Sequence, residues 1–353
     1  MVRKSEKLRI AVLMGGPSSE HDVSLQGGKN VVDALDRRRF DVRPVVITRE
    51  GRWRVAARAW GGAPNGFDPL AESGWREFEG PCEGLVYLKG RGIDVALPIL
   101  HGRFGEDGTL QALLLAAGIP FVGSDSRASA LAADKIRTKE ILGFHGIPTP
   151  RFEVLGPEAL RRGRQATAAR LAQAFGLPLV IKDPLGGSTL EVRICDDVGQ
   201  VQAAMDELAP PAERLLVELY VKGRELTVAV LEDLDSGRPV PLPVIEIRPR
   251  KSRYFDYAEK YSADGAEELC PAPLEEALTA RVQALALAVH TLLGLKGLSR
   301  TDIMLAEDGS LHVLETNTMP GMTARSLVPR AASAVGLAFP ALVENLVRRA
   351  SLS

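Results

Sequence analysis

The chain has 353 residues, with 44 Lys plus Arg against 45 Asp plus Glu and a formal net charge of −1 at pH 7. Balanced charge argues against a general nucleic-acid or membrane surface, and no apolar run is long enough to cross a bilayer. The apolar share of 45% and the charged share of 25% are those of a soluble globular protein, and the length favours two or three domains.

The three cysteines, Cys82, Cys195 and Cys270, lie far apart in the sequence and show no metal-ligand spacing. We therefore expect reduced, buried thiols in a cytosolic protein. The apolar run at residues 10–14 is short and ends in two glycines, which predicts a strand rather than a signal peptide.

The first predicted elements are a buried strand at residues 8–14, a glycine-rich turn and a helix at residues 23–35. Such a turn presents backbone N–H groups and a helix N-terminus to a ligand. It is not the GxGxxG motif, which disfavours a dinucleotide oxidoreductase. Glu20 in this turn would take a ligand ammonium or, equally well on this stretch alone, favour the helix start.

Further strands at residues 42–47 and 94–100 and a helix at residues 110–116 complete a predicted parallel α/β sheet. Between them, residues 52–83 are rich in Gly, Pro and Trp and predict an irregular peripheral insertion.

His101 and Glu106 follow the third of these strands in a loop with three glycines. Ligands gather at the carboxyl ends of strands in open α/β sheets, so we expect this loop to face a ligand. A lone histidine is more often structural, but this one shares its loop with two acids.

A helix predicted at residues 129–144 carries Lys135 and Lys139 and leads to a second α/β segment. The strand at residues 179–182 ends in a lysine and runs into the Gly/Ser loop 186–189. Backbone donors, hydroxyls and a lysine charge suit contact with phosphate, although a plain hairpin turn fits the same residues.

The second half of the chain contains a long polar segment, residues 247–273, spotted with aromatic residues. A long segment of this kind inside a compact domain is usually a functional lid. The surrounding elements are predicted as strands at 215–220, which contains Glu218, and 226–231, and helices at 274–293 and 339–349.

The strongest local pattern is a hairpin whose apolar runs, residues 301–305 and 311–314, flank an Asp308-Gly309 turn. With a two-residue loop, facing positions pair so that four polar side chains share one face of the hairpin: Arg300, Asp302, Glu315 and Asn317. The opposite face then takes Ile303, Leu305, His312 and Leu314.

Two carboxylates and an amide oxygen on one face predict a site for a hard divalent cation such as Mg²⁺. Arg300 adds a donor fork for phosphate or a developing oxyanion. The alternative is a solvated hairpin face with cross-strand ion pairs.

Six motifs, taken in their order, resemble the ATP-grasp ligases and, within them, the D-alanine–D-alanine ligase family. They are GGPSSEHDVSL, HGRFGEDGTLQ, YFDYAEKY, RTDIML, LETNTMPGMT and SLVP. The resemblance covers nearly the whole chain. It implies an N-terminal parallel α/β domain at residues 1–126 and two α+β domains, 127–221 and 222–353, which grip ATP between them.

The resemblance also implies how ATP is bound. Adenine would lie near Glu218, the ribose hydroxyls would bind Glu225, and Lys135 and Lys182 would hold phosphates. Lys260 on the mobile loop would reach the γ-phosphate. Two Mg²⁺ or Mn²⁺ ions would be carried by Asp302, Glu315 and Asn317.

For the amino-acid substrates, the resemblance implies that Glu20, linked to Ser188 and Tyr261, takes the ammonium of the first D-alanine. His101 is a further substrate-binding residue, and Ser326 and Leu327 would bind the carboxylate of the second D-alanine. The oxyanion of the second step would be stabilised by Arg300 and the backbone near Gly321.

The implied activity is ATP-dependent ligation of two D-alanines through an acyl phosphate, for peptidoglycan precursors. The implied partners are small molecules, neither nucleic acid nor membrane, and a homodimer is allowed. Two alternatives stay open at this point. One is a related ligase that takes D-lactate, D-serine or another amino acid as second substrate, and the other is a nucleotide-binding homologue with weakened catalysis.

Overall fold

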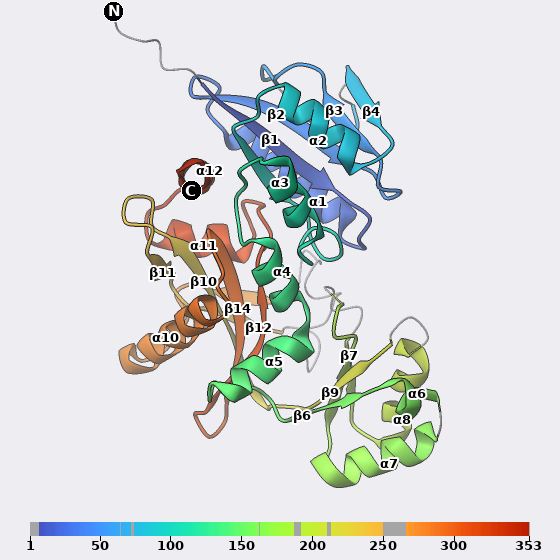
Figure 1. Cartoon of the computed structure of the whole chain (residues 1–353). Helices are drawn as coiled ribbons and strands as arrows, with labels where there is room; N and C mark the ends of the chain where they lie inside the picture. Colours follow the sequence, from blue (N-terminus) through green and yellow to red (C-terminus); the bar gives the residue numbers. More distant parts are fainter. Residues whose placement is uncertain are drawn as a thin grey trace, which may run out of the picture.

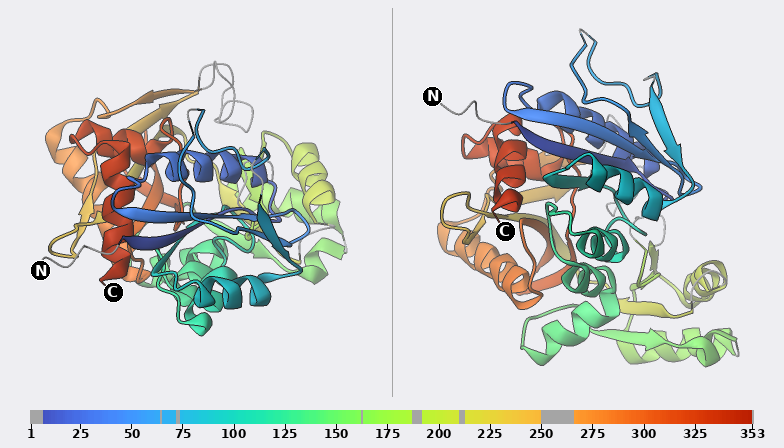
Figure 2. Two further views of the ribbon diagram at one scale, coloured as in Figure 1. Left: turned by 90° about the horizontal axis from the view of Figure 1, so that it is seen from above. Right: turned by 45° about the horizontal axis from the view of Figure 1, so that its top comes forward.

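The computed structural model describes residues 7–63, 65–71, 74–161, 163–186, 192–209, 213–249 and 266–352. Within these residues the chain forms three β-sheets with helices packed on them (Figure 1). Figures 1 and 2 show the middle sheet and its helices as a lobe beside the other two sheets.

The N-terminal sheet has the strand order β4-β3-β2-β1-β5. As the sequence predicts, β1 is paired in parallel with both of its neighbours. Its residues from Ile10 to Met14 are completely buried, which explains the continuous apolar run of a strand covered on both faces. The elements here are β1 (Leu8–Gly15), α1 (His21–Ala34), β2 (Phe40–Ile47), β5 (Val95–Ile99) and α3 (Thr109–Ala117).

The prediction of an irregular insertion at residues 52–83 is wrong. β3 (Trp53–Ala56) and β4 (Trp75–Phe78) extend the sheet as an antiparallel ribbon, followed by α2 (Pro81–Gly90). Trp53 is fully buried, and a Cβ on Gly84 of α2 would lie 2.6 Å from its ring. Strands of four residues set among Gly and Pro offer too few alternations for a sequence pattern to emerge.

The helix predicted at residues 129–144 is two helices, α4 (Ser126–Ala133) and α5 (Lys135–Phe144). Asp134 between them has an extended backbone, and its side chain accepts hydrogen bonds from the N–H groups of Ile136 and Arg137. An aspartate that caps a new helix interrupts the preceding one, which ends here. The break places Lys135 at the first turn of α5.

The middle sheet is antiparallel throughout, in the order β6-β9-β7-β8. Alternate residues, such as Leu179 and Ile181, pack in one core with Leu171 and Met205 of its helices. The residues between them, including Lys182, face a cavity. The elements are β6 (Phe152–Leu155), α6 (Pro157–Arg161), α7 (Arg164–Phe175), β7 (Leu179–Lys182), β8 (Val192–Cys195), α8 (Val198–Leu208) and β9 (Leu215–Leu219).

The C-terminal sheet is also antiparallel, in the order β13-β12-β10-β14-β15, with β11 paired to β10. Its elements are β10 (Gly223–Glu232), β11 (Pro239–Pro241), β12 (Ile245–Arg248), β13 (Glu267–Leu269), α10 (Glu276–Leu292), β14 (Leu298–Ala306) and β15 (Leu311–Asn317). Of the predicted lid, residues 250–265 lie outside the described residues. Its two ends form the paired strands β12 and β13.

The helices α11 (Leu327–Ala334) and α12 (Phe339–Ser351) tie the end of the chain to the N-terminal sheet. Val328, Leu342 and Val347 share one core with Val12 and Leu97. In the described part of the chain, no single helix is long and apolar enough to cross a membrane. Among the helices that the structure describes, the bent pair α11–α12 passes such a test by joint length and composition.

The cysteine prediction holds in part. All three cysteines are free thiols, and Cys195 is buried, which raises its pKa to about 11. Cys270 is partly buried. Cys82 is exposed rather than buried, because it lies near the start of α2 on the side that faces solvent.

Candidate active site

One cavity of about 940 Å³ lies where the three sheets meet. It gathers every predicted site residue that the structure describes: Glu20, His101, Lys135, Lys182, Glu218, Glu225, Arg300, Asp302, Glu315, Asn317, Gly321, Ser326 and Leu327. The predicted residues Ser188, Lys260 and Tyr261 lie outside the described residues. Residues from widely separated parts of the sequence thus line one space, as a ligand site requires.

The β14–β15 hairpin has the predicted cross-strand pairs, but its loop length and its register near the loop differ from the prediction. Arg300 pairs with Asn317 and Asp302 with Glu315. The predicted two-residue loop is wrong. The Ala306 N–H donates to Ser310 O at 2.9 Å, which closes a three-residue loop whose Gly309 has φ of +80°.

A β-bulge at Leu314 compensates for the longer loop. Beyond it, Ile303 pairs with Val313 rather than with the next residue, so Leu314 is extra. Leu314 and Glu315 therefore both line the cavity. The prediction that Leu314 lies on the face away from the site is therefore wrong. The same prediction for His312 is also wrong, because His312 pairs with Met304 and paired residues share a face of the sheet, and Met304 lines the cavity. Ile303 and Leu305 are buried away from the site, as predicted, together with Leu311 and Val313.

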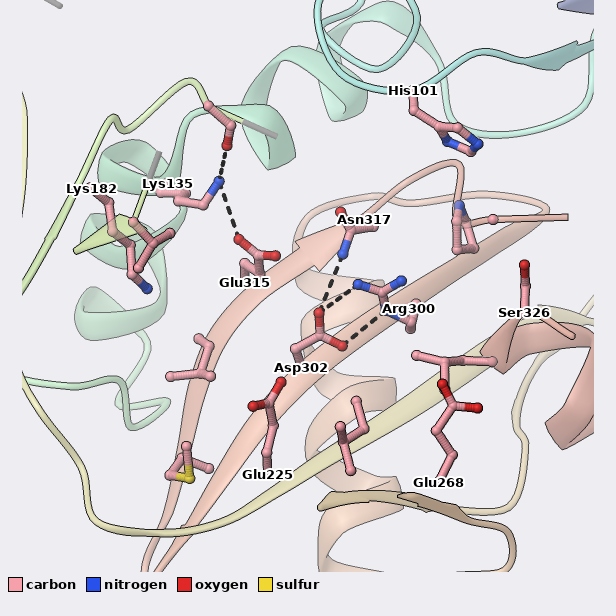
Figure 3. Close-up of a pocket in the computed structure, with 18 of the residues that line it drawn as sticks. His101, Lys135, Lys182, Glu225, Glu268, Arg300, Asp302, Glu315, Asn317 and Ser326 are labelled. Carbon is pink, nitrogen blue, oxygen red and sulfur yellow. Dashed lines mark hydrogen bonds and ion pairs between the residues drawn. The ribbon is translucent and has the colours of Figure 1, made fainter. Parts of the chain in front are cut away.

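Asp302 is the centre of the hydrogen bonds on this face (Figure 3). Arg300 donates to both carboxylate oxygens, from Nε at 2.9 Å and from Nη2 at 2.7 Å. Thr227 Oγ1 donates at 2.6 Å, and Asn317 Nδ2 lies at 3.5 Å. Burial alone would lower the pKa of Arg300, but the adjacent Asp302 charge raises it, so the guanidinium stays charged.

Lys135 connects this face to the middle sheet. Its Nζ lies 3.1 Å from Glu315 Oε2 and donates to Gly186 O at 2.6 Å (Figure 3). Gly186 begins the Gly/Ser loop that the sequence assigns to phosphate contact. The lysine therefore lies between the predicted metal ligands and the predicted phosphate loop.

The pKa of Glu225 depends on the acids that lie in this part of the cavity. Burial, followed by the charges of Asp302 and Glu315, raises the pKa of Glu225 to about 8. The charges of Asp302 and Glu315 thus still act on Glu225 even though Arg300 and Lys135 pair with these two acids. In the described residues, no three His, Cys, Asp or Glu side chains converge to hold a metal by themselves. Two carboxylates and an amide, completed by substrate phosphates, fit Mg²⁺.

Glu218 lines the same cavity but lies among cations. Its Oε2 is 2.6 Å from Lys182 Nζ, and its Oε1 contacts Lys139 Nζ. Glu218 and Lys139 are each 1% exposed. Burial alone would raise the pKa of Glu218, but the two lysines lower it to about 2.

The N-terminal sheet contributes two loops at the carboxyl ends of its adjacent strands β1 and β5, which carry Glu20 and His101. His101 Nδ1 lies 3.0 Å from Met319 O, so it donates, and among the described residues its buried Nε2 has no partner. Glu106 accepts from the N–H groups of Gly102 and Met319. Burial raises the pKa of Glu106, and the charge of Glu20 adds to this.

Ser326 precedes α11 at the remaining edge of the cavity. Its Oγ accepts from the Thr323 N–H at 3.1 Å and lies 2.8 Å from Thr323 Oγ1. A Cβ at Gly321 would approach Ser326 Oγ to 2.9 Å, so only glycine fits without a shift of this loop.

Sequence reasoning missed three acidic or basic groups that line the cavity or support it. Glu246 accepts from Arg224 and Arg248, and its pKa falls to about 2. Glu268 lines the cavity, and Lys139 pairs with Glu218. Glu246 is a charged residue within the apolar run of residues 244–247, and this pattern could have indicated a functional role. The sequence around Glu268 and Lys139 shows no such pattern.

Comparisons with known proteins agree with this site. Residues 9–124 match the family model for the D-ala D-ala ligase N-terminus, and residues 141–348 match that for its C-terminus. A D-alanine--D-alanine ligase of Janthinobacterium sp. (strain Marseille) is 40% identical over 352 residues, which cover 99% of this chain and 97% of that protein.

Solved structures give the same result. The D-alanine-D-alanine ligase from Coxiella burnetii aligns with a TM-score of 0.78 and 28% identity, covering 98% of this chain and 94% of that one. The Bacillus anthracis ligase complexed with ATP aligns with a TM-score of 0.74 and 30% identity, covering 98% and 97%. The three-domain ATP-grasp fold predicted from the sequence is confirmed, and the chain belongs to the D-alanine–D-alanine ligase family.

Proposed function

We propose that this chain uses ATP to join two molecules of D-alanine into D-alanyl-D-alanine. The observation that carries the proposal is the single cavity in which the Arg300–Asp302–Glu315 face meets the lysines of the middle sheet and the Glu20 and His101 loops. Each of these groups comes from a different sheet or loop, and each has a part in a two-substrate phosphoryl transfer.

In the first step, the carboxylate of the first D-alanine attacks the γ-phosphorus of ATP. This forms an acyl phosphate and releases ADP. Lys135 and Lys182 hold the phosphates, and Glu20 binds the ammonium of the amino acid. Glu218 and Glu225 contact adenine and ribose. Apolar residues that line the cavity, such as Met304 and Leu314, suit the adenine ring.

In the second step, the free amine of the second D-alanine attacks the acyl carbon, the amine loses its proton, and inorganic phosphate leaves. Arg300 and the backbone near Gly321 stabilise the tetrahedral oxyanion. Ser326 and Leu327 bind the second carboxylate, and His101, whose Nε2 can accept a hydrogen bond, contributes to this substrate site. Ser188, Lys260 and Tyr261 complete the proposal as lid and loop residues that keep water from the acyl phosphate.

Asp302, Glu315 and Asn317 are proposed to hold two Mg²⁺ or Mn²⁺ ions. Their oxygens are the ligands that these ions prefer, and a cation would offset the charges of Asp302 and Glu315, which add to burial in raising the pKa of Glu225. When bound, the ions spread the charge that develops during phosphoryl transfer.

Release of inorganic phosphate from ATP and Mg²⁺ tests the proposal, with D-alanine, D-lactate or D-serine present and the product identified by mass spectrometry. We expect release that depends on D-alanine, with D-alanyl-D-alanine as product. A mixed product made only when D-lactate or D-serine is present would reject the assigned second substrate. Binding of ATP without any release would reject ligase activity.

The same proposal extends to three features of the protein as a whole. The chain divides into domains at residues 1–126, 127–221 and 222–353, acts in the cytosol in the supply of peptidoglycan precursors, and assembles as a homodimer. Size-exclusion chromatography with light scattering tests the last of these.

A further inference from the structure

Lys139 is a fully buried lysine that the proposed chemistry does not use. It lies on α5, and its side chain is 1% exposed. A lysine is almost never buried to this extent unless it is paired. Its Nζ contacts Glu218 Oε1 and donates to Thr149 Oγ1, and it lies 5.9 Å from the centre of the Phe152 ring.

The contacts of Lys139 connect it to two parts of the cavity lining, Glu218 and the β15 strand. On one side, Glu218 is shared between Lys139 and Lys182. On the other side, Thr149 Oγ1 donates to Val313 O at 2.9 Å, and the Val313 N–H donates to Pro148 O at 2.9 Å. Both backbone groups of Val313 are thus held by the segment that follows α5.

Val313 is next to the bulge that sets the register of the hairpin. The bulge residue Leu314 separates it from Glu315, which pairs with Asp302. The extra residue of a bulge is left unpaired and disrupts the ladder locally, so the strand depends here on hydrogen bonds from outside the hairpin. The hydrogen bonds to Val313 hold the strand at this point.

We propose that Lys139 is a positioning residue for nucleotide binding, which keeps Lys182 available to phosphates by sharing Glu218 and, through Thr149, fixes β15 beside Glu315. The inference rests on the proposed function, because it gives Lys182 the role of a phosphate ligand.

Charge accounts for the first part of this role. Lys182 pairs with Glu218 in the structure and must leave it, wholly or in part, to bind phosphate. With Lys139 in place, Glu218 keeps a counter-charge when Lys182 moves. Without Lys139, the same movement leaves a buried carboxylate unpaired, which is strongly unfavourable. Lys182 would then stay with Glu218 and bind phosphate less well.

The test compares Lys139→Met with the wild-type protein and with Lys89→Met as a matched control. Lys89 is an exposed lysine on α2 that donates to Gly118 O. We measure the Kd for ATP without D-alanine by calorimetry, the KM for each substrate and the Tm. In Lys139→Met we expect the Kd and KM for ATP to rise about tenfold, equivalent to roughly 1.4 kcal/mol, and the KM for D-alanine to change less than about twofold.

The Tm separates a positioning role from a structural one. Removal of one lysine from two that share one acid leaves a neutral pair, and methionine has a similar shape, so we expect no large fall in Tm. A lower Tm with ATP and D-alanine affected equally would show a structural role and overturn the proposal. An unchanged ATP affinity would overturn it as well.

A second pair of variants tests the same proposal if Lys139→Met does not fold. Thr149→Val removes the hydroxyl that links Lys139 to Val313, and Thr149→Ser keeps it. We expect about threefold weaker ATP binding in the valine variant and wild-type binding in the serine variant, a difference of roughly 0.6 kcal/mol. Equal affinities in the two variants would overturn the proposal. Failure of the wild-type protein itself to bind ATP or to ligate D-alanine would instead reject the proposed function.

Discussion

Two glutamates that line the same cavity have opposite pKa shifts. Glu218, at the end of β9, has a pKa lowered to about 2, and Glu225, near the start of β10, has a pKa raised to about 8. Burial raises the pKa in both cases, so it does not explain the difference. The neighbours do, because Glu218 lies between two lysines and Glu225 lies near two other acids.

The comparison shows that one short stretch of chain passes from a cation-rich region to an acid-rich one. The cationic end, where Lys182 lines the cavity and Lys139 is buried behind Glu218, suits phosphate through Lys182. The acidic end, with Asp302 and Glu315, suits metal ions and hydroxyl donors such as those of ribose. On the proposed function, phosphates at Lys182 and metal ions at Asp302 and Glu315 would match both regions at once.

The largest expected effect comes from Asp302→Asn, which removes one of the acids that act on Glu225. We expect kcat for phosphate release to fall by about 10³-fold, because the variant loses a proposed metal ligand and the counter-charge of the buried Arg300. It should also lower the pKa of Glu225. Steady-state kinetics and a pH titration of stability measure the two effects.

Asp308→Asn provides the matched control for that substitution. Asp308 lies in the exposed loop of the same hairpin and accepts hydrogen bonds from Ser310. Its kinetics should equal those of the wild-type protein. An Asp302→Asn enzyme with more than about a tenth of wild-type kcat would contradict the metal assignment.

The next effect is on stability and concerns the cationic end. Glu218→Gln removes the acid that pairs with both Lys139 and Lys182 in a buried site, so we expect a loss of about 3–5 kcal/mol in the free energy of unfolding. Urea unfolding followed by circular dichroism measures it. Glu153→Gln, which breaks the more exposed pair with Arg170 on the same sheet, should cost less than about 1 kcal/mol. Equal losses in the two variants would mean that the lysines are not held by Glu218.

The acidic end was largely predictable from the sequence because it lies on one hairpin. Alternation of residues 301–305 placed Asp302 on the opposite face from Ile303, and the Asp-Gly turn located the loop. The predicted face of Leu314 was wrong because the β-bulge at this residue has no sequence signature of its own. The correct pairs emerged because a longer loop and a bulge changed the register by one residue each, in opposite directions.

The cationic end was not predictable in the same way. Lys139, Thr149 and Glu218 come from α5, the segment after it and β9, and no periodic pattern relates positions on three elements. The family resemblance supplied Glu218 and Lys182 as ligand residues, but Lys139 had no role until the structure placed it against Glu218. Tertiary packing alone brings such groups together.

The smallest expected effect is on the pH dependence of stability and tests Glu225 directly. Its pKa is raised from 4.5 to about 8 in the folded protein, so its contribution to stability is fully present below about pH 4.5 and is lost as the pH rises through about 8. Glu218 acts in the reverse sense, since its contribution is present above about pH 4.5 and is lost as the pH falls through about 2. Between pH 4.5 and 8, only Glu225 of the two should change the stability.

Glu225→Gln should therefore flatten the stability profile in a metal-free buffer between these two pH values. Because Glu225 is only partly buried, we expect a difference from wild type of the order of 1–2 kcal/mol at pH 8, with the variant more stable. Glu307→Gln, an exposed glutamate paired with Lys222, should keep the wild-type slope. Thermal unfolding at several pH values measures all three proteins. A slope in Glu225→Gln as steep as in wild type would show that burial and the charges of Asp302 and Glu315 do not raise the pKa of Glu225.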